Sequence, residues 1–190
     1  MPPTGRRERK KAQTRQALAD AARELFLEHG YDGVTVAQIA DEADVSIATL
    51  FKHVPDGKEA LIFDDGVERR EALVKAVRDR DPGTSTLRAL RAFFVRRGPF
   101  DPDMSPDLKR LRDLIVGTPA LGDYQRKLWQ SAEGVLAEAI AAESGRDPSE
   151  PAVRALVRYV LEVPDLAGRE PDPLHALHEI FDLLESGWHD

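Results

Sequence analysis

The sequence predicts an all-α protein, and two observations support that prediction. No segment shows the sustained alternation of apolar and polar residues that a half-buried strand needs. Helix starts are instead marked by a capping residue followed by proline, because proline tolerates the first helical position. The pairs are Ser105-Pro106, Thr118-Pro119, Asp147-Pro148 and Asp172-Pro173. About nine helices are expected, near residues 11–29, 35–42, 46–53, 57–79, 84–97, 105–117, 118–143, 149–163 and 173–186.

The first two helices are predicted from their spacing and their ends. The first should end near Gly30, since glycine accepts the positive φ of a helix terminus. Thr35 and Gln38 have the spacing of a capping box at the start of the second helix. Apolar residues at helical spacing give each helix one inward face: Leu18, Ala22, Leu25, Phe26, Val36, Ile39, Ala40 and Ala43.

The third helix, capped by Ser46, completes a short helical trio. Its apolar residues are expected to pack it down: Ile47, Leu50, Phe51 and Val54. Its other face is small, polar and basic, with no acid, as a helix in the major groove requires. With the second helix it has the length and spacing of a helix-turn-helix. An ordinary short surface helix has the same geometry, so geometry alone leaves both interpretations open.

The remaining helices are expected to form a larger C-terminal part. Asp56 and Glu59 have capping-box spacing at the start of the fourth helix, which should cross from one part to the other. Pro164 should stop or kink the eighth helix, and Gly187 should close the ninth. The predicted domains are residues 1–57 and residues 58–190.

Charge is distributed unevenly along the chain. The net charge is −7, from 27 basic and 34 acidic residues. Residues 6–15 contain six basic side chains and one acid, a local charge of +5, which leaves −12 on the rest of the chain. A basic arm on an acidic body indicates a polyanionic partner at one end, although a solvated terminus would have the same composition.

Several classes of protein are excluded or disfavoured. The chain has no cysteine, so disulfides, thiolate ligands and thiol catalysis are excluded. With no bilayer-spanning stretch and no secretory signal, we expect a cytoplasmic protein without a membrane partner. No nucleotide-binding or hydrolase motif occurs. His175 and His178 lack a convincing third ligand, and Asp64-Asp65 is interpreted as a solvated pair. We therefore expect no cofactor and no metal, and an enzyme only as an alternative.

The amino-acid sequence of the N-terminal segment closely resembles that of the DNA-binding domain of the tetracycline-repressor (TetR) family. The resemblance covers about residues 12–61 and lies in residues 26–31, 34–40, 43–54 and 58–61. It implies a one-component bacterial transcription regulator, usually a repressor, with an all-helical fold. It also implies a divergent C-terminal ligand domain and a homodimer built through the last helices.

The resemblance also implies which residues contact DNA. Thr35 would cap a helix whose free amides receive a phosphate, and Lys58 would meet another phosphate. The chain departs from the usual family residues at Asp44, Ala48 and Phe51, and Asp56-Gly57 lengthens the link before Lys58. The expected DNA-binding residues are Arg9, Lys10, Thr35, Ser46, Ala48, Thr49, Phe51, Lys52, His53 and Lys58.

The C-terminal helices suggest a ligand cavity, with simple core packing as the alternative for each residue. The expected lining is Phe93, Phe94, Arg97, Met104, Leu111, Arg112, Ile115, Tyr124, Leu128 and Trp129. Arg126 is a further candidate for a polar ligand group.

The last two helices have broad apolar arcs, which predict a dimeric four-helix bundle or, alternatively, a self-contained core. The expected interface is Val153, Leu156, Val157, Val160, Leu174, Leu177, Phe181 and Leu184.

The sequence thus predicts a dimeric repressor on a pseudopalindromic double-stranded DNA operator. A small-molecule effector would release it by changing the orientation of the fourth helix. Two alternatives remain. One is a regulator controlled by a partner protein, which would have a solidly packed C-terminal body. The other is a small helical enzyme.

Overall fold

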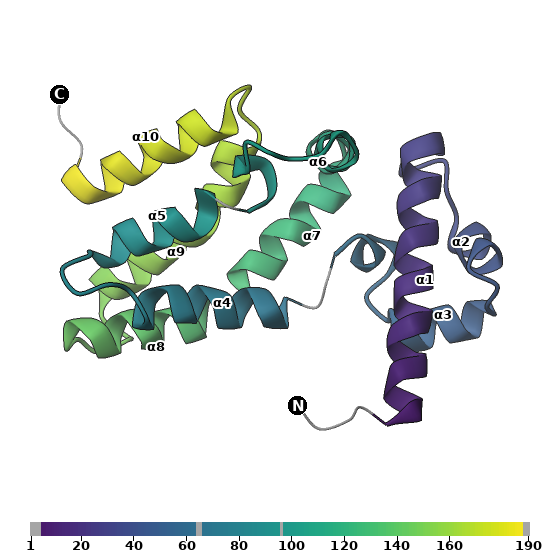
Figure 1. The fold of residues 1–190 in the computed structure, drawn as a ribbon, viewed down its shortest axis with the longest axis horizontal. Coiled ribbons are helices and arrows are strands. Elements are labelled where there is room, and N and C mark those ends of the chain that lie inside the picture. The colour runs from purple at the N-terminus through teal and green to yellow at the C-terminus, as the bar shows by residue number, and fades with distance from the viewer. Residues whose placement is uncertain (1–4, 64–65, 96, 188–190) are drawn as a thin grey trace.

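The computed structural model describes residues 5–63, 66–95 and 97–187, and within them the regular structure is entirely helical (Figure 1). The α-helices are α1 (Arg6–His29), α2 (Val36–Glu42), α3 (Ile47–His53), α4 (Val67–Arg78), α5 (Thr86–Val95), α6 (Pro106–Gly117), α7 (Pro119–Gln130), α8 (Glu133–Ser144), α9 (Pro151–Gly168) and α10 (Pro173–Ser186). Two 3₁₀ turns complete the order: η1 (Lys58–Leu61) lies between α3 and α4, and η2 (Gly98–Phe100) lies between α5 and α6. The all-α prediction is confirmed. None of the helices in these residues is long and apolar enough to cross a membrane.

Two hydrophobic cores organise the molecule. Figure 1 shows α1, α2 and α3 in an N-terminal body at one side and α4–α10 in a larger C-terminal body. The N-terminal core is built from helices α1–α3 and η1, but it also contains Leu121, which is fully buried and comes from α7. Its members are Leu18, Ala21, Ala22, Phe26, Tyr31, Val34, Ile39, Ala40, Leu50, Val54, Ala60, Leu61 and Leu121. This core therefore extends past residue 57, the boundary expected from the sequence.

The C-terminal core is centred on an aromatic cluster. The ring of Phe94 lies 5.2 Å from that of Phe93, 5.4 Å from Trp129 and 6.0 Å from Phe181, between ring centroids. Helices α4, α5, α8, α9 and α10 pack around these rings. Helices α6 and α7 connect the two bodies, because α6 packs on α1 and α7 packs on η1.

The expected helix over residues 57–79 is instead η1 followed by α4. Gly57 has a φ of 100° and Gly66 a φ of 71°, and neither value fits a continuous right-handed helix. The predicted capping box of Asp56 and Glu59 is also wrong. Gly57 occupies the cap position, and the Glu59 carboxylate accepts a hydrogen bond from the Tyr31 hydroxyl. The Asp64-Asp65 pair lies outside the described residues.

Two other expected helices have different limits. The helix over 118–143 is divided into α7 and α8, and the Ser131 hydroxyl at the break donates to the Leu128 carbonyl at 2.7 Å. Such side-chain bonds compete with the helical backbone pattern. At the N-terminus α1 already begins at Arg6, so the basic stretch is the start of a helix and not an extended arm.

The predicted helix starts at a capping residue followed by proline are partly confirmed. Ser105 accepts from the Leu108 amide and Asp172 from the His175 amide, as predicted. Asp147-Pro148 does not start a helix: Asp147 accepts from Ser149 in a turn, and α9 begins at Pro151. Pro164 lies inside α9, which continues to Gly168.

Candidate nucleic-acid interface and ligand cavity

The helix-turn-helix formed by α2 and α3 is held by local hydrogen bonds that the sequence predicts. The Thr35 hydroxyl accepts from the Gln38 amide at 3.3 Å, and the Gln38 side chain accepts from the Thr35 amide at 2.8 Å. The Ser46 hydroxyl accepts from the Thr49 amide at 3.1 Å at the start of α3. Between the helices Asp44 has a φ of 52°, a left-handed conformation that aspartate tolerates better than most residues. The departure from glycine at position 44 therefore leaves the turn intact.

Helix α3 is anchored by fewer residues than its apolar spacing predicts. Leu50 and Val54 are buried, but Ile47 is 47% exposed and Phe51 is 46% exposed. The expectation that Ile47 and Phe51 pack the helix down is wrong, since Leu50 is the buried residue within α3. The outer surface of α3 thus combines two large apolar side chains with Ser46, Ala48 and Lys52, all exposed.

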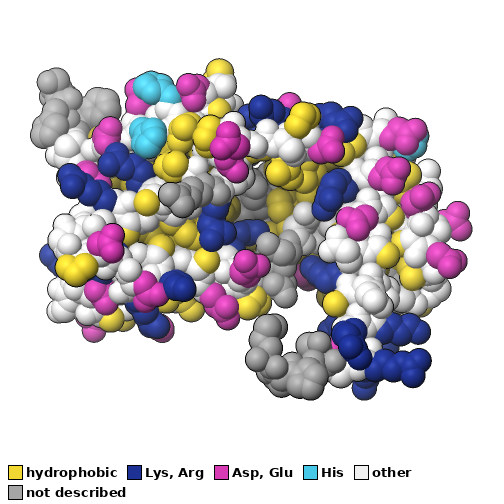
Figure 2. All heavy atoms as spheres, viewed as in Figure 1, with side chains coloured by type: hydrophobic (Ala, Val, Ile, Leu, Met, Phe, Trp, Pro, Cys, Tyr) yellow, Lys and Arg dark blue, Asp and Glu magenta, His cyan; other side chains and the backbone are white. Residues whose placement is uncertain are grey.

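The basic start of α1 lies beside the C-terminal end of α3. Arg15 donates from Nη1 to the His53 carbonyl at 3.1 Å, which ties the two helices together. Figure 2 shows Lys and Arg side chains gathered at the end of α1 nearest the N-terminus. These exposed residues are Arg6, Arg7, Arg9, Lys10 and Lys11. The cationic helix start and α3 therefore form one surface, here called the α1–α3 surface.

His53 reflects this concentration of positive charge. Burial lowers the pKa of its imidazole below the usual value, and the charges of Lys11, Lys52 and Arg15 lower it further. Within the described structure its Nδ1 atom is buried without a hydrogen-bond partner. An approaching phosphate would raise the pKa of His53 again, because an anion favours the protonated imidazole.

Lys58 is oriented differently from the other expected DNA-binding residues. Its Nζ donates to the Tyr31 carbonyl at 2.8 Å and to the Val34 carbonyl at 2.9 Å. It also lies 3.9 Å from the centroid of the Tyr31 ring, a cation–π distance. Two of its three N–H donors therefore hold the loop before α2, and a phosphate contact could use only the third.

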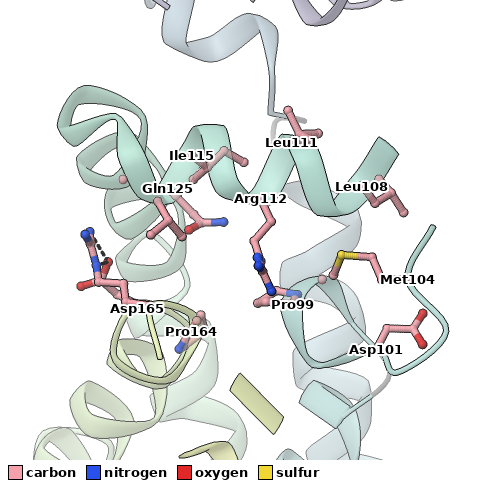
Figure 3. Close-up of a pocket in the computed structure, with 15 residues that line it drawn as sticks. Pro99, Asp101, Met104, Leu108, Leu111, Arg112, Ile115, Gln125, Pro164 and Asp165 are labelled. Atoms are coloured by element: carbon pink, nitrogen blue, oxygen red, sulfur yellow. Dashed lines mark hydrogen bonds and ion pairs between the residues drawn. The ribbon is translucent and has the colours of Figure 1, made fainter. Parts of the chain in front are cut away.

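A cavity of about 170 Å³ lies between α6, the turn at η2, α7 and the C-terminal end of α9 (Figure 3). Arg112 points from α6 toward Pro99, and Gln125 points from α7 into the same space. Opposite them the Asp165 carboxylate accepts from Arg169 Nε at 2.9 Å and from Arg126 Nη2 at 2.6 Å. The lining is Gly98, Pro99, Asp101, Met104, Leu108, Leu111, Arg112, Ile115, Val116, Gly122, Gln125, Pro164, Asp165, Gly168 and Arg169.

Asp165 stays ionised in this wall. Burial alone would raise the pKa of its carboxyl group, but the hydrogen bonds and charges of Arg126 and Arg169 outweigh it, and the pKa is lowered. Gly122 leaves room for the arrangement, because a Cβ atom there would lie 2.8 Å from Arg169 Nη2. The two arginines and the aspartate thus form one ion-paired group, in which Arg126 also pairs with Asp123 and Glu162.

Four of the expected ligand residues line this cavity, namely Met104, Leu111, Arg112 and Ile115. The others are elsewhere. Phe93, Phe94 and Trp129 are buried in the C-terminal core, and Arg97 lies against the Phe93 ring at 4.3 Å. Leu128 is partly buried and is not part of the lining. Tyr124 stacks on Phe63 at 5.6 Å and packs against the N-terminal core.

Sequence reasoning missed the wall that α7 and α9 contribute. Gln125, Pro164, Asp165, Gly168 and Arg169 belong to it. One signal was available: within a helix rich in apolar residues a proline and an acid stand side by side, with a glycine four residues after the proline. Such an interruption is typical of a helix that faces something other than a close-packed core.

The expected dimer residues are mostly internal. Val153, Val157, Val160, Leu177 and Phe181 are buried in the chain's own C-terminal core, so they cannot form a surface. Leu156, Leu174 and Leu184 are partly buried and pack against that core. The reason is that α9 is packed by α7, α8 and α10 of the same chain, which use its apolar arc. The large apolar side chains that α9 and α10 do expose are Tyr159, Leu166 and Leu183.

Acidic and histidine side chains do not gather into a metal site. In the part of the chain that the structure describes, no three of them are placed to hold an ion. His175 lies 3.6 Å from Glu179 on an exposed face of α10.

Two family models match the chain. The model described as bacterial regulatory proteins, tetR family, matches residues 18–64. The model described as the MftR C-terminal domain matches residues 84–189, which is more than half of the chain.

Similar proteins carry names that agree with these matches. The HTH-type transcriptional regulator TcmR of Streptomyces glaucescens is 36% identical over 152 residues, which cover 75% of this chain and 66% of TcmR. The mycofactocin biosynthesis transcriptional regulator MftR of Mycobacterium tuberculosis is 28% identical over 76% of this chain and 73% of MftR. The solved structure of Salmonella enterica GusR has a TM-score of 0.56 at 18% identity, covers 90% of this chain and 93% of GusR, and shows the same fold. The relatives are named as regulators, in agreement with the expectation that the chain is no enzyme.

Proposed function

Because this chain belongs to the tetR family of DNA-binding transcriptional regulators, we propose that it is a dimeric repressor released from its operator by a small molecule bound in the α6 cavity. The observation that carries the proposal is the α1–α3 surface, an acid-free exposed helix face beside a cationic helix start. Its place of action would be the bacterial cytoplasm, where the operator lies.

The α1–α3 surface has the parts that operator recognition needs. Ser46, Ala48 and Thr49 are small enough for close approach to base edges, and Lys52 supplies a charge. Phe51 and Ile47, both exposed, would contact thymine methyl groups. Arg9 and Lys10 would contact phosphates along the flanking backbone, as would the amides at the start of α2 beside Thr35.

A homodimer would place two copies of α3 in successive major grooves, about 34–36 Å apart. The exposed face of α9 and α10 supports an interface there. Tyr159 is 60% exposed, and Leu166 and Leu183 are also exposed. These residues replace the buried ones expected from spacing. The interface is proposed because these exposed residues lie on the last two helices, through which the family resemblance implies that the homodimer is built.

The cavity has a direct physical link to the DNA-binding body. Ile115 lines the cavity and also packs against the N-terminal core, and its neighbour Leu114 packs on that core as well. A ligand that moves α6 would therefore act on α1 through these side chains. We propose this route in place of a reorientation of α4, which packs mainly on α5 and α8. Coupling of this kind typically amounts to about 1–3 kcal/mol.

The alternative of a regulator without a small ligand predicts a solidly packed C-terminal body. The cavity of about 170 Å³ beneath α6 favours the ligand-responsive form.

The proposal is tested by selecting bound DNA from a genomic pool and then measuring the affinity of variants for the recovered site. Lys52→Ala should weaken binding roughly tenfold, since it removes one charged group that meets the duplex, and should leave the dimer intact. Lys75→Ala is the matched control, because that side chain is 76% exposed and belongs to α4, which lies in the C-terminal body (Figure 1). Equal affinity of Lys52→Ala and the wild type would refute α3 as the recognition helix.

A further inference from the structure

We infer that the α6 cavity takes a small carboxylic acid, with one ring or a short alkyl chain in the apolar part and the carboxylate on Arg112. The inference rests on the proposed effector function of the cavity and adds the chemical class of the ligand. Three features of the described residues lead to it: the lack of burial of α6, the cavity volume, and the different pairing of the two cavity arginines.

Helix α6 carries aliphatic side chains that the fold covers only in part. It contains Leu108, Leu111, Leu114, Ile115 and Val116, and yet none of its residues is buried. Leu108 is 53% exposed at the cavity edge. A helix with an apolar stripe normally packs that stripe into a core. Here four of the five residues face the cavity or its rim, so an apolar ligand would complete their packing.

The cavity is large enough for a small apolar group. Its volume of about 170 Å³ is close to that of an engineered cavity of about 150 Å³ that holds benzene. A single aromatic ring or an alkyl chain of roughly six to eight carbons fits such a volume. Apolar surface lies on both sides, from Leu111 and Ile115 on α6 and from Pro164 on α9.

Arg169 is not available to a ligand. Its Nε and Nη2 atoms lie 2.9 Å and 2.8 Å from Asp165 Oδ1. The side chain of Asp165 is only 14% exposed and also pairs with Arg126. Arg169 is 41% exposed, but its partner carboxylate is shielded from water, so this ion pair is costlier to break than one between two solvated groups.

Arg112, in contrast, is available to a ligand. Its Nε and Nη2 atoms both donate to one oxygen of the adjacent Asp113, at 3.0 Å and 2.6 Å. Asp113 is 64% exposed, and ion pairs with such solvated partners contribute little. The guanidinium has five N–H donors, so several remain for a carboxylate even while Asp113 is bound. Arg112 therefore can exchange a solvated anion for one held in the cavity.

The remaining charges of the cavity do not oppose an anion. Asp165 is compensated by its two arginines. Asp101 points away from Arg112 in Figure 3, and its Oδ1 atom accepts from the Asp103 amide. Gln125 adds an amide that can donate to a ligand oxygen.

The test compares acids with neutral alcohols of the same shape by calorimetric titration of the full chain. The probes are benzoate, phenylacetate and octanoate, against benzyl alcohol, 2-phenylethanol and 1-octanol. At least one acid should bind tenfold or more tightly than its alcohol. Arg112→Met keeps the length of the side chain and should reduce that acid to the affinity of the alcohol. Arg110→Met is the matched control, an exposed arginine of the same helix outside the cavity, and should keep the preference.

Three results would overturn the inference: no binding in either series, no acid preference in the wild type, or a preference that survives in Arg112→Met. A parallel measurement on the DNA complex separates this failure from failure of the proposed function. An acid that binds through Arg112 but leaves DNA affinity unchanged refutes the effector function and leaves the assigned chemistry standing. Release by the alcohols, unaffected by Arg112→Met, supports the effector function and refutes the carboxylate site.

Discussion

Helices α3 and α6 both expose large hydrophobic side chains, but for different reasons. In α3, Ile47 and Phe51 face outward while Leu50 and Val54 hold the helix on a closed core. In α6 no residue is buried, and the helix lies over a cavity. The first arrangement presents a fixed surface, and the second leaves a helix whose position depends on what fills the space below. An exposed leucine or phenylalanine therefore has to be interpreted through its neighbours on the same helix.

The largest expected difference between the two helices is in stability. Leu50→Ala should cost about 3 kcal/mol of unfolding free energy, as full burial predicts for leucine truncation. Leu111→Ala in α6 should cost less than about 1 kcal/mol, because the side chain is only partly buried beside empty space. Urea denaturation of both variants measures the two values. Similar losses would mean that α6 is as firmly packed as α3.

The second test concerns how the fixed surface is supported. Lys58→Met should destabilise the protein by about 1–2 kcal/mol, since the carbonyls of Tyr31 and Val34 lose a charged donor. Lys52→Met, which removes an exposed charge, is the control and should leave stability unchanged. A Lys58→Met variant of normal stability but weak DNA binding would instead assign Lys58 to a phosphate.

A smaller effect is expected from the cationic start of α1. Deletion of residues 1–10 removes Arg6, Arg7, Arg9 and Lys10, and should lower affinity for DNA by at most about tenfold. The dependence of log affinity on log salt should become flatter by about one unit for each phosphate that the shortened chain no longer neutralises. Fluorescence anisotropy between low and moderate salt measures the slope. An unchanged slope would mean that these charges do not touch the duplex.

The smallest expected effect is a pH dependence of stability. The pKa of His53 is lowered in the folded protein by burial and by the charges of Lys11 and Lys52. The unfolded chain therefore binds a proton more readily, and stability should decline as the pH falls below about 6.5. His53→Gln should reduce that decline, whereas His175→Gln, an exposed control, should not. Chemical denaturation at pH 7.5 and pH 5.5 makes the comparison, and an identical decline in His53→Gln would contradict it.

Local features of the molecule were predictable from the sequence. The capping residues Thr35 and Ser46, the left-handed Asp44 and the buried face of α1 all depend on neighbours within a few positions. The breaks at Gly66 and Ser131 were not predicted, because glycine and serine are also tolerated within helices. When one sequence is searched for helical periodicity, such residues fit the pattern on both sides, so the break between two helices is not detected.

The burial of α9 and the cavity depend on packing that spacing does not determine. Val153, Val157 and Val160 have helical spacing whether they face their own chain or a second copy. Arg112 and Ile115 could be identified as candidates by residue type, but Asp165 and Arg169 on the opposite wall could not, since they are 50 or more positions away. Only the folded arrangement brings α6 and α9 to the same cavity.

Leu121 limits how the N-terminal body can be reused. This α7 side chain is fully buried among residues of α1–α3, so a chimera that joined residues 1–61 to the sensor of another regulator would lack part of its own core. The resulting void would be the size of one leucine and would cost about 2–5 kcal/mol. Exchange of sensors between regulators of this type therefore requires an apolar side chain at the equivalent position of the incoming α7. Recombination between such proteins is constrained in the same way, because the two halves must share this contact.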